Sequence, residues 1–194
     1  MVKTLDVNAT YEPAKRSFNW LKLKKDYLET ELSDSLDLVV VGADFGSGKR
    51  VGLYGAFLLA CWNEDLECFQ TVCKVGTGLT DENLEKMHEL MVDLEIDTAP
   101  SNLKYKTKNV DTWIVPTYVW ELRAADLSLS PTYMAAIGEV EADKGISLRF
   151  ARYIRSRDDK KPEECTTNEQ IVEFYKAQSV VNIDFNAKND DYDF

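Results

Sequence analysis

A single change of hydrophobic period constrains the fold of this 194-residue chain more than any other feature. Short apolar runs with β-strand character are predicted at residues 19–25, 36–43, 51–62, 67–75, 118–129 and 146–150. Between the fourth and fifth runs, from Thr80 to about Leu94, apolar residues instead recur at intervals of three and four, with Thr80 placed to cap a helix. The sequence therefore predicts a β-dominated chain with one inserted amphipathic helix.

This order of elements fits a small Greek-key barrel of the OB-fold type, in which one helix interrupts a series of strands. A second, short helix is predicted at residues 168–178, after Pro162. An SH3-like barrel fits the pattern nearly as well. The fold class is thus expected to be all-β dominated, an OB-fold barrel with one inserted helix and a short C-terminal helix, and this alone does not determine function.

The distribution of charge says more than the net charge of -11. Residues 1–25 and 146–161 each contain six basic and two acidic side chains, whereas the segments around them are acidic or nearly neutral. Two basic islands on one face would form a phosphate-binding surface that the overall charge conceals. No apolar run approaches the roughly 20 residues that cross a bilayer, so we expect a soluble, intracellular protein with no membrane partner.

The four cysteines do not form a metal-binding pattern. Cys61, Cys68, Cys73 and Cys165 contain no C-x-x-C pair, and the only histidine, His88, is far from Cys165 in the sequence. We therefore expect no metal site, buried reduced thiols, and a His88 side chain on the surface of the first helix.

Three basic segments are candidates for chemistry, and each also has a structural interpretation. Lys22 and Lys24 lie two positions apart on a predicted strand, about 7 Å apart on one face, which a solvated strand face would also explain. Residues 149–160 interleave arginines with aromatics, as a nucleic-acid surface does, but a basic edge strand would look the same. Residues 46–50, with Lys49 and Arg50, lack the spacing of a P-loop and equally suit a plain hairpin turn.

In this order, the segments resemble the eukaryotic ATP-dependent DNA ligases, in particular their replicative members, from residue 1 to about residue 178. Residues 1–3 resemble the end of nucleotidyltransferase motif IV, residues 15–28 resemble motif V, and residues 149–160 resemble motif VI. Further matches lie at 37–43, 73–78, 120–121 and 125–131. Two departures are Ala151, where motif VI commonly has proline, and Ser47, where the hairpin can carry a basic residue.

For catalysis, the resemblance implies use of ATP with Mg²⁺. Lys22 and Lys24 would neutralise the α-phosphate of ATP, and Lys3 and Arg16 would also contact the nucleotide. The motif VI residues that would meet the β- and γ-phosphates are Arg157, Asp159 and Lys160. The lysine that carries AMP belongs to a K-x-D-G motif that this sequence does not contain, so we expect the chain by itself to be inactive.

For substrate and organisation, the resemblance implies nicked duplex DNA, sealed during replication and repair. The DNA-binding residues would be Arg149 and Phe150 at the minor groove, together with Arg152, Lys49 and Arg50. Residues 1–25 would end an adenylation domain, 26–165 would form the OB-fold domain, and 166–194 a helix with an acidic flexible tail. The other ligase domains would be partners, the location nuclear, and the chain monomeric. The alternatives are a stand-alone OB-fold binding module and a fragment of an mRNA capping guanylyltransferase or RNA ligase.

Overall fold

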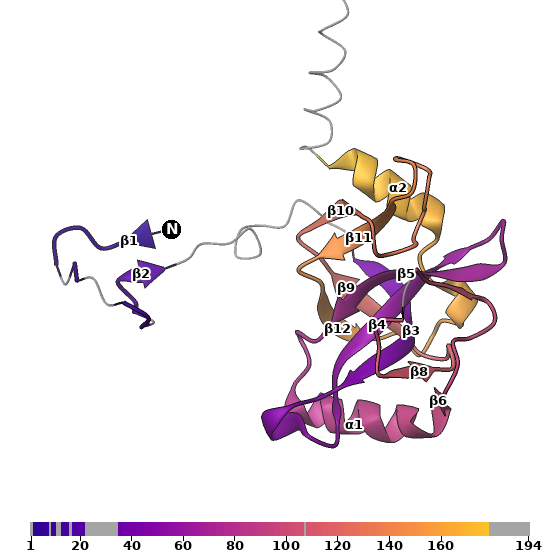
Figure 1. The fold of residues 1–194 in the computed structure, drawn as a ribbon, viewed down its shortest axis with the longest axis horizontal. Coiled ribbons are helices and arrows are strands. Elements are labelled where there is room, and N and C mark those ends of the chain that lie inside the picture. Colours follow the sequence, from indigo (N-terminus) through magenta and orange to yellow (C-terminus); the bar gives the residue numbers. More distant parts are fainter. Residues whose placement is uncertain are drawn as a thin grey trace, which may run out of the picture. The chain divides into compact units, whose positions relative to one another are not determined.

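The computed structural model describes residues 2–7, 9–10, 13–15, 17–21, 35–106 and 108–178 of the chain (Figure 1). The chain divides into two compact units, residues 1–30 and 31–194. In the first unit, β1 (Val2–Lys3) pairs antiparallel with β2 (Trp20–Leu21). The predicted strand at 19–25 is therefore described only as far as Leu21, and its remaining residues lie outside the described part of the chain.

The second unit is organised around a curled antiparallel sheet. Its central strands, in spatial order, are β12 (Arg152–Ser156), β9 (Val119–Arg123), β3 (Leu36–Phe45), β4 (Tyr54–Asn63) and β5 (Cys68–Val75). Just after β5, the carbonyl of Thr77 accepts a hydrogen bond of 3.0 Å from the amide of Tyr153 in β12. The first and last of these strands are thus brought together, and the sheet curls around a core.

Shorter elements extend this sheet, connect its strands or pair beside it. They are η2 (Gly48–Arg50), η3 (Val92–Leu94), β6 (Glu95–Ile96), β7 (Leu103–Lys104), β8 (Thr112–Ile114), β10 (Asp126–Ser130), β11 (Gly145–Arg149) and η4 (Pro162–Glu164). Strands β10 and β11 form a separate antiparallel pair, while β7 pairs parallel with β5, and β8 pairs with both β3 and β6.

Two helices lie against opposite ends of the curled sheet, as Figure 1 shows: α1 (Asp81–Met91) and α2 (Asn168–Ala177). The Thr80 hydroxyl caps α1 by accepting from the amide of Asn83, and Thr167 forms a capping box with Gln170 at the start of α2. The buried residues of α1 are Leu84, Met87 and Met91, at the three- and four-residue spacing seen in the sequence. Both predicted helices are confirmed.

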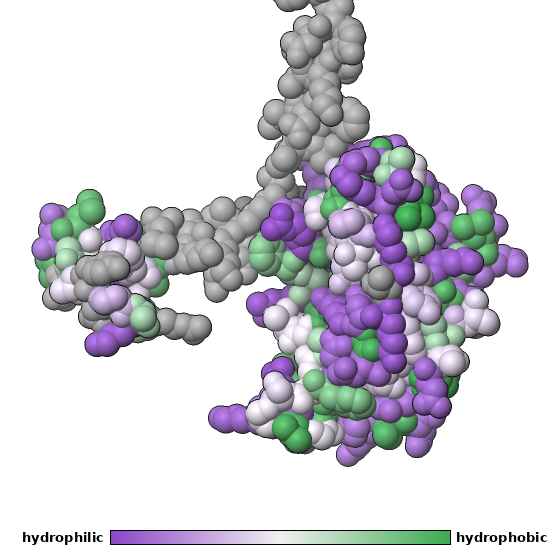
Figure 2. All heavy atoms as spheres, viewed as in Figure 1, coloured by the Kyte–Doolittle hydropathy of each residue, from purple (hydrophilic) through white to green (hydrophobic). Residues whose placement is uncertain are grey.

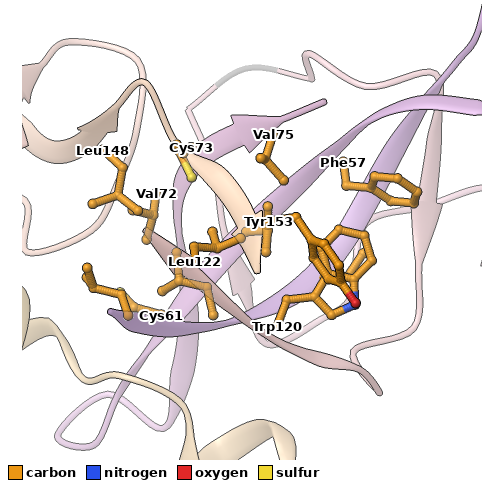
Figure 3. Packing of buried hydrophobic residues seen from close by; sticks show 14 of the residues in the cluster. Phe57, Cys61, Val72, Cys73, Val75, Trp120, Leu122, Leu148 and Tyr153 are labelled. Atoms are coloured by element: carbon orange, nitrogen blue, oxygen red, sulfur yellow. The ribbon is translucent and has the colours of Figure 1, made fainter. Parts of the chain in front are cut away.

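Three aromatic rings of the core pack in a row, and one of them belongs to β12. Trp120 packs edge-on between Phe57 and Tyr153, with ring centroids 4.7 and 4.9 Å apart (Figure 3). Edge-to-face pairs of this kind add attraction to the area that they bury. Because Tyr153 is the second residue of β12, these rings anchor the first part of the strand to the core.

Strand β3 is buried on both faces. Val40 belongs to the main cluster with α1 and α2, whereas Val39 and Val41 pack into a second cluster with Trp113 of β8. All of its first eight residues, including Asp37, are buried. A carboxylate in such a strand must have charged or hydrogen-bonding partners.

Two strand predictions were wrong. Residues 118–129 form two strands instead of one, because the chain turns at Ala124 and Ala125, where the Ala125 amide bonds to the carbonyl of Arg149. Phe150 does not continue the alternation of Ile146 and Leu148. It adopts a positive φ of 55° between β11 and β12, which redirects the chain from one strand into the other.

The hairpin between β3 and β4 differs in detail from the prediction. Gly48 has the expected positive φ, at 62°, but Gly46 does not. Gly46 is required for another reason, since a Cβ there would lie 2.4 Å from the carbonyl oxygen of Arg50. His88 is not on the helix surface: it is half-buried, and its ring packs edge-on against Tyr54 at 4.8 Å.

Hydrophobic residues reach the face of the larger unit shown in Figure 2 only in small, separate patches. Neither described helix is long and apolar enough to span a bilayer.

Candidate functional site

Strand β12 carries a cluster of charged residues at its end and an exposed aromatic residue before its start. Five strand residues at about 3.3 Å each separate the two places by roughly 16 Å. We call the first place the carboxylate–cation cluster and define it by Asp37, Arg157, Asp159 and Lys160. The second is the aromatic bend, residues 149–152.

In the carboxylate–cation cluster, one oxygen atom holds two cations. Asp37 Oδ2 lies 2.7 Å from Arg157 Nη1 and 2.7 Å from Lys160 Nζ. The guanidinium of Arg157 also donates from Nε and Nη2 to the two oxygens of Asp159, at 2.9 and 2.7 Å. The side chain of Asp37 is 12% exposed, whereas that of Asp159 is 63% exposed. The cluster therefore has one nearly buried carboxylate, Asp37, and one that is open to solvent, Asp159.

The contacts between Arg157 and Asp159 favour the ionised forms of both groups. The fork of hydrogen bonds from Arg157 holds the pKa of the Asp159 carboxyl well below its usual range. The same bonds, aided by the charges of Asp37 and Asp159, raise the pKa of the Arg157 guanidinium. With two cations and two carboxylates, the cluster has no net charge. Its hydrogen bonds hold the charged groups in fixed positions, as a site for a multiply charged ligand requires.

Backbone hydrogen bonds hold the cluster from three sides. The amide of Asp37 donates to Thr166 Oγ1 at 3.0 Å, and the Thr166 amide donates back to the carbonyl of Asp37 at 2.8 Å. The Arg157 amide donates to the carbonyl of Val119, and the Lys160 amide to the carbonyl of Arg157. The cations thus sit on a tight turn that is tied to β9, opposite a carboxylate fixed in β3.

A second carboxylate, Glu121, stands directly opposite Asp37 on the neighbouring strand β9. Like charges in such a pair repel unless cations lie between or beside them. Glu121 accepts from Ser35 Oγ at 2.7 Å and from Arg155 Nε at 2.6 Å, and these bonds lower the pKa of its carboxyl. Glu121 is therefore hydrogen-bonded to Arg155 and Asp37 to the cluster cations, while the charge of Arg157 also lowers the pKa of Glu121.

A cavity of about 340 Å³ lies beside the cluster and is lined by Asp37 and Lys160, but also by Glu64, Glu163 and Glu164. Four carboxylates around one cavity repel a phosphate group. The side of Lys160 and Arg157 near the exposed Asp159 is therefore the more favourable approach for an anion.

The aromatic bend presents a ring to solvent. Phe150 is 47% exposed, and the Cζ atom of Arg149 lies 5.3 Å from the centre of its ring. Arg149 is also 3.7 Å from a carboxylate oxygen of Asp126, and Arg152 is exposed. An exposed ring flanked by arginines can stack on or wedge between bases while the cations contact phosphates.

The segment after β5 supports the bend. Thr77 Oγ1 donates to the carbonyl of Ala151 at 2.8 Å, next to Phe150. Gly78 has a φ of +88°, and a Cβ there would lie 2.4 Å from the carbonyl oxygen of Tyr153. The bend is therefore built on a contact that only glycine permits at this position.

The hairpin residues Lys49 and Arg50 border the same segment. Arg50 Nη2 lies 3.5 Å from Asp81, the first residue of α1 and three positions after Gly78. Lys49 is exposed in η2. The structure thus brings the predicted DNA-binding residues of the hairpin and of the bend to either side of residues 77–81, although they are far apart in the sequence.

The remaining predicted site residues belong to the first unit. Lys3 Nζ lies 4.1 Å from the centre of the Trp20 ring, in a cation–π contact. Arg16, Lys22 and Lys24 lie outside the described residues, so their predicted roles are untested.

No thiol or metal chemistry emerges from the described residues. The four cysteines are free and buried, as predicted. Burial raises the pKa of Cys73 and of Cys165 to about 12, so both thiols are protonated at neutral pH and are poor nucleophiles. The described His, Cys, Asp and Glu side chains form no group that could hold a metal ion.

Sequence reasoning missed Asp37 as a member of the site. Its signal was present, because Asp37 is a single acidic residue in an otherwise apolar run from Leu36 to Ala43. A charged residue in a strand that is buried on both faces requires a charged partner. The sequence contains no indication of which cations supply that partner.

Comparisons with known proteins show the family and the fold of the chain. Residues 50–160 match the family model described as "ATP dependent DNA ligase C terminal region". The chain is 52% identical over 192 residues to DNA ligase 1 of Arabidopsis thaliana, covering 98% of the chain and 24% of that protein. It is 51% identical over 182 residues to DNA ligase 1 of Schizosaccharomyces pombe, covering 92% of the chain and 24% of that protein. The chain thus spans about a quarter of the length of these relatives.

Among solved structures, the ligase domain of LigD from M. tuberculosis superposes with a TM-score of 0.53 at 23% identity, covering 69% of this chain and 38% of that one. Mycobacterial DNA ligase D, solved with ATP and MES, gives a TM-score of 0.50 at 22% identity, with the same coverage. At this identity the likeness concerns the fold, and the predicted β-dominated OB-fold is confirmed. By the match to its family model, the chain belongs to the C-terminal region of the ATP-dependent DNA ligases.

Proposed function

We propose that this chain is the part of an ATP-dependent DNA ligase that closes over ATP during self-adenylation and then clasps duplex DNA at a nick. The observation that carries the proposal is that one strand, β12, ends in a cluster of fixed cations and begins beside an exposed aromatic residue flanked by arginines. Membership of the ligase family supports ATP as the ligand of the first place and nicked DNA as the ligand of the second.

In the adenylation step, the carboxylate–cation cluster would bind the β- and γ-phosphates of ATP. Arg157 and Lys160 supply the positive charge, and Asp159 fixes the plane of the guanidinium. Holding the pyrophosphate in line as a leaving group lowers the barrier through orientation and charge stabilisation. This accounts for cations held in fixed positions, which a surface that only attracts DNA does not need.

In the sealing step, the aromatic bend and the hairpin would contact DNA. Phe150 would wedge into the minor groove beside the nick, while Arg149 and Arg152 meet phosphates. Lys49 and Arg50, on the other side of residues 77–81, would contact the backbone. A protein that uses both ends of β12 in turn must reorient between steps, as lids and clasps in other enzymes do.

An edge-strand role alone does not explain these residues. Strand β12 stands at one end of the strand order, so exposed arginines such as Arg152 and Arg155 would also protect it from pairing with other chains. Arg157 is different, because its side chain is drawn inward to Asp37 and is only 19% exposed. Protection of an edge requires no such contact.

The proposal also assigns roles to residues of the first unit, and it concerns the Mg²⁺ that accompanies ATP. Lys3, Arg16, Lys22 and Lys24 would contact ATP, with Lys22 and Lys24 at its α-phosphate, as the ligase resemblance implies. Because the described residues offer no metal-ligand group, we assign no Mg²⁺ ligand to them. Residues 1–25 would end the adenylation domain, with 26–165 as the OB-fold domain and 166–194 as a C-terminal extension. The protein would act as a monomer in the nucleus, together with the remaining ligase domains.

Two assays test the proposal on the full-length protein that contains this chain. Incubation with ATP labelled at the α-phosphate and Mg²⁺ should leave a covalent AMP label on the protein, and addition of a nicked duplex should yield a sealed strand. Absence of both products would refute the ligase proposal. DNA binding without either product would instead support a stand-alone binding module, and adenylation with sealing of RNA nicks alone would support an RNA ligase.

A further inference from the structure

We infer that Asp37 is a positioning residue for the polyphosphate site, holding Arg157 and Lys160 at a fixed spacing so that both can serve one ATP molecule. The inference rests on the proposed function of those two cations and adds a residue from a different strand, 120 positions away in the sequence.

The geometry of one oxygen sets the spacing. Arg157 Nη1 and Lys160 Nζ both lie 2.7 Å from Asp37 Oδ2, so the two nitrogens are no more than twice 2.7 Å, or about 5.4 Å, apart. Two cations this close repel each other strongly unless a carboxylate lies between them. Neighbouring phosphoryl groups of one polyphosphate need donors at such a short separation, so Asp37 creates a pair that the cations would not form alone.

Asp37 is also suited to a fixed role by its burial. It is the second residue of β3, its side chain is 12% exposed, and its amide and carbonyl are both bonded to Thr166. The solvent-exposed side of the cluster is formed by Asp159, whose side chain is 63% exposed, and by Lys160, whose side chain is 30% exposed, so a phosphate can reach Lys160 without displacing Asp37. Asp37 can therefore remain bound to both cations while the exposed side of the cluster takes up the ligand.

A residue of this kind acts through others and does not touch the reacting atoms. Such supporting contacts keep site residues near the productive geometry, and their loss reduces activity without removing the site. A purely structural ion pair would behave differently, because its loss would lower stability and affect every step of the reaction alike.

The test uses the full-length ligase that contains this chain, with Asp37→Asn. The two side chains have the same shape, and the amide can occupy the position of Oδ1, which has no hydrogen-bond partner among the described residues. We expect self-adenylation to fall by on the order of 10-fold to 100-fold, mainly through a higher KM for ATP. Sealing of a nick that is already adenylated should stay within about 2-fold of wild type, because that step uses no ATP.

Glu121→Gln is the matched control. It makes the same acid-to-amide change at the position directly opposite, but Glu121 binds Arg155 and not the cluster cations. Both steps should remain within about 2-fold of wild type for this variant, since Arg155 is 63% exposed and an ion pair with a solvated member contributes little. Thermal unfolding of both variants shows how much each change costs in stability.

A double-mutant cycle with Lys160→Ala provides a second readout. If Asp37 acts through Lys160 and Arg157, Asp37→Asn should cost clearly less in the Lys160→Ala background than in wild type. Additive losses would contradict the inference. If Asp37→Asn does not fold, Asp37→Glu decides, because it keeps the charge but moves it by one methylene, and it should raise the KM for ATP while leaving sealing of adenylated nicks unchanged.

The outcomes separate the inference from the proposal on which it rests. A wild-type protein that takes up no AMP refutes the proposed function. If the wild-type protein takes up AMP, three results for Asp37→Asn refute only the role of Asp37. They are normal adenylation, faster adenylation, and an equal loss in adenylation and sealing. Faster adenylation would mean that Asp37 competes with ATP for the cations.

Discussion

The two ends of strand β12 differ in how their charges are held. At the end of the strand, Arg157 is 19% exposed and is bonded to two carboxylates. Before its start, Arg149 is 55% exposed and is near a single carboxylate, at 3.7 Å. Fixed cations suit a small ligand whose phosphates must be aligned for reaction, whereas mobile, exposed cations suit a long polyanion that is held by many contacts. One strand therefore carries both kinds of charged site that the proposed function requires.

The difference also lies in the supporting structure. The cluster is anchored by a buried strand, β3, whereas the aromatic bend rests on a loop, residues 76–78, and on one threonine hydroxyl. Between the two, the ring of Tyr153 in β12 packs edge-on against Trp120 of β9. Changes at one end should consequently leave the other end in place, and the following variants test this independence in the full-length protein.

The largest effect is expected from Lys160→Ala. Removal of one cation that stabilises the leaving pyrophosphate should slow self-adenylation by on the order of 100-fold. Sealing of a nick with a pre-adenylated 5′ end should be spared. Rapid-quench measurement of AMP transfer, beside a gel assay of sealing, compares the two steps. An equal loss in both would mean that the two ends of β12 do not act separately.

The second-largest effect is expected from Gly78→Ala, which tests the close contact that supports the aromatic bend. Gly78 and Gly138 both have positive φ, at 88° and 81°, but a Cβ would clash only at Gly78. Gly138→Ala should cost about 1 kcal/mol of unfolding free energy from backbone conformation alone. Gly78→Ala should cost about 2 kcal/mol more, because the clash displaces β12. Urea unfolding of the two variants compares them, and equal losses would show that the contact between Gly78 and Tyr153 yields easily.

Phe150→Ala should produce the opposite kinetic pattern to Lys160→Ala. Because the variant loses a ring that would stack on or wedge between bases, the rate of sealing should fall by about 10-fold. Self-adenylation should be largely unchanged, because the ring is exposed and Phe150 lies at the other end of β12 from the cluster. Phe150→Leu serves as a control that keeps an apolar wedge. A parallel loss of adenylation in Phe150→Ala would contradict the assigned role.

The smallest effect is expected from Lys49→Ala in the hairpin. Binding to a nicked duplex should weaken by only a few-fold, and the slope of log affinity against log salt concentration should fall by about 1, as for the loss of one phosphate contact. Fluorescence anisotropy at several salt concentrations measures both quantities. Lys86→Ala, on the exposed side of α1, is the control. An unchanged slope in Lys49→Ala would place the hairpin away from DNA.

Elements whose signals are local can be predicted from the amino-acid sequence alone. The helix from Asp81 to Met91 is predictable because its apolar spacing and its threonine cap lie within one stretch of chain. The same is true of β3, β4 and β5, whose apolar runs are long enough to be identified without a partner. The order of the ligase-like motifs likewise points to Arg157, Lys160 and Phe150 from the sequence.

How these residues are combined depends on the tertiary structure. The pairing of Asp37 with Arg157 and Lys160 joins positions about 120 residues apart, and the approach of the hairpin to the aromatic bend depends on Gly78 and Asp81 between them. The break at Ala124 and the turn at Phe150 also follow from strand pairing. Local spacing fixes which face of an element is apolar, but the partner of a buried charge is set by which strands become neighbours when the sheet curls.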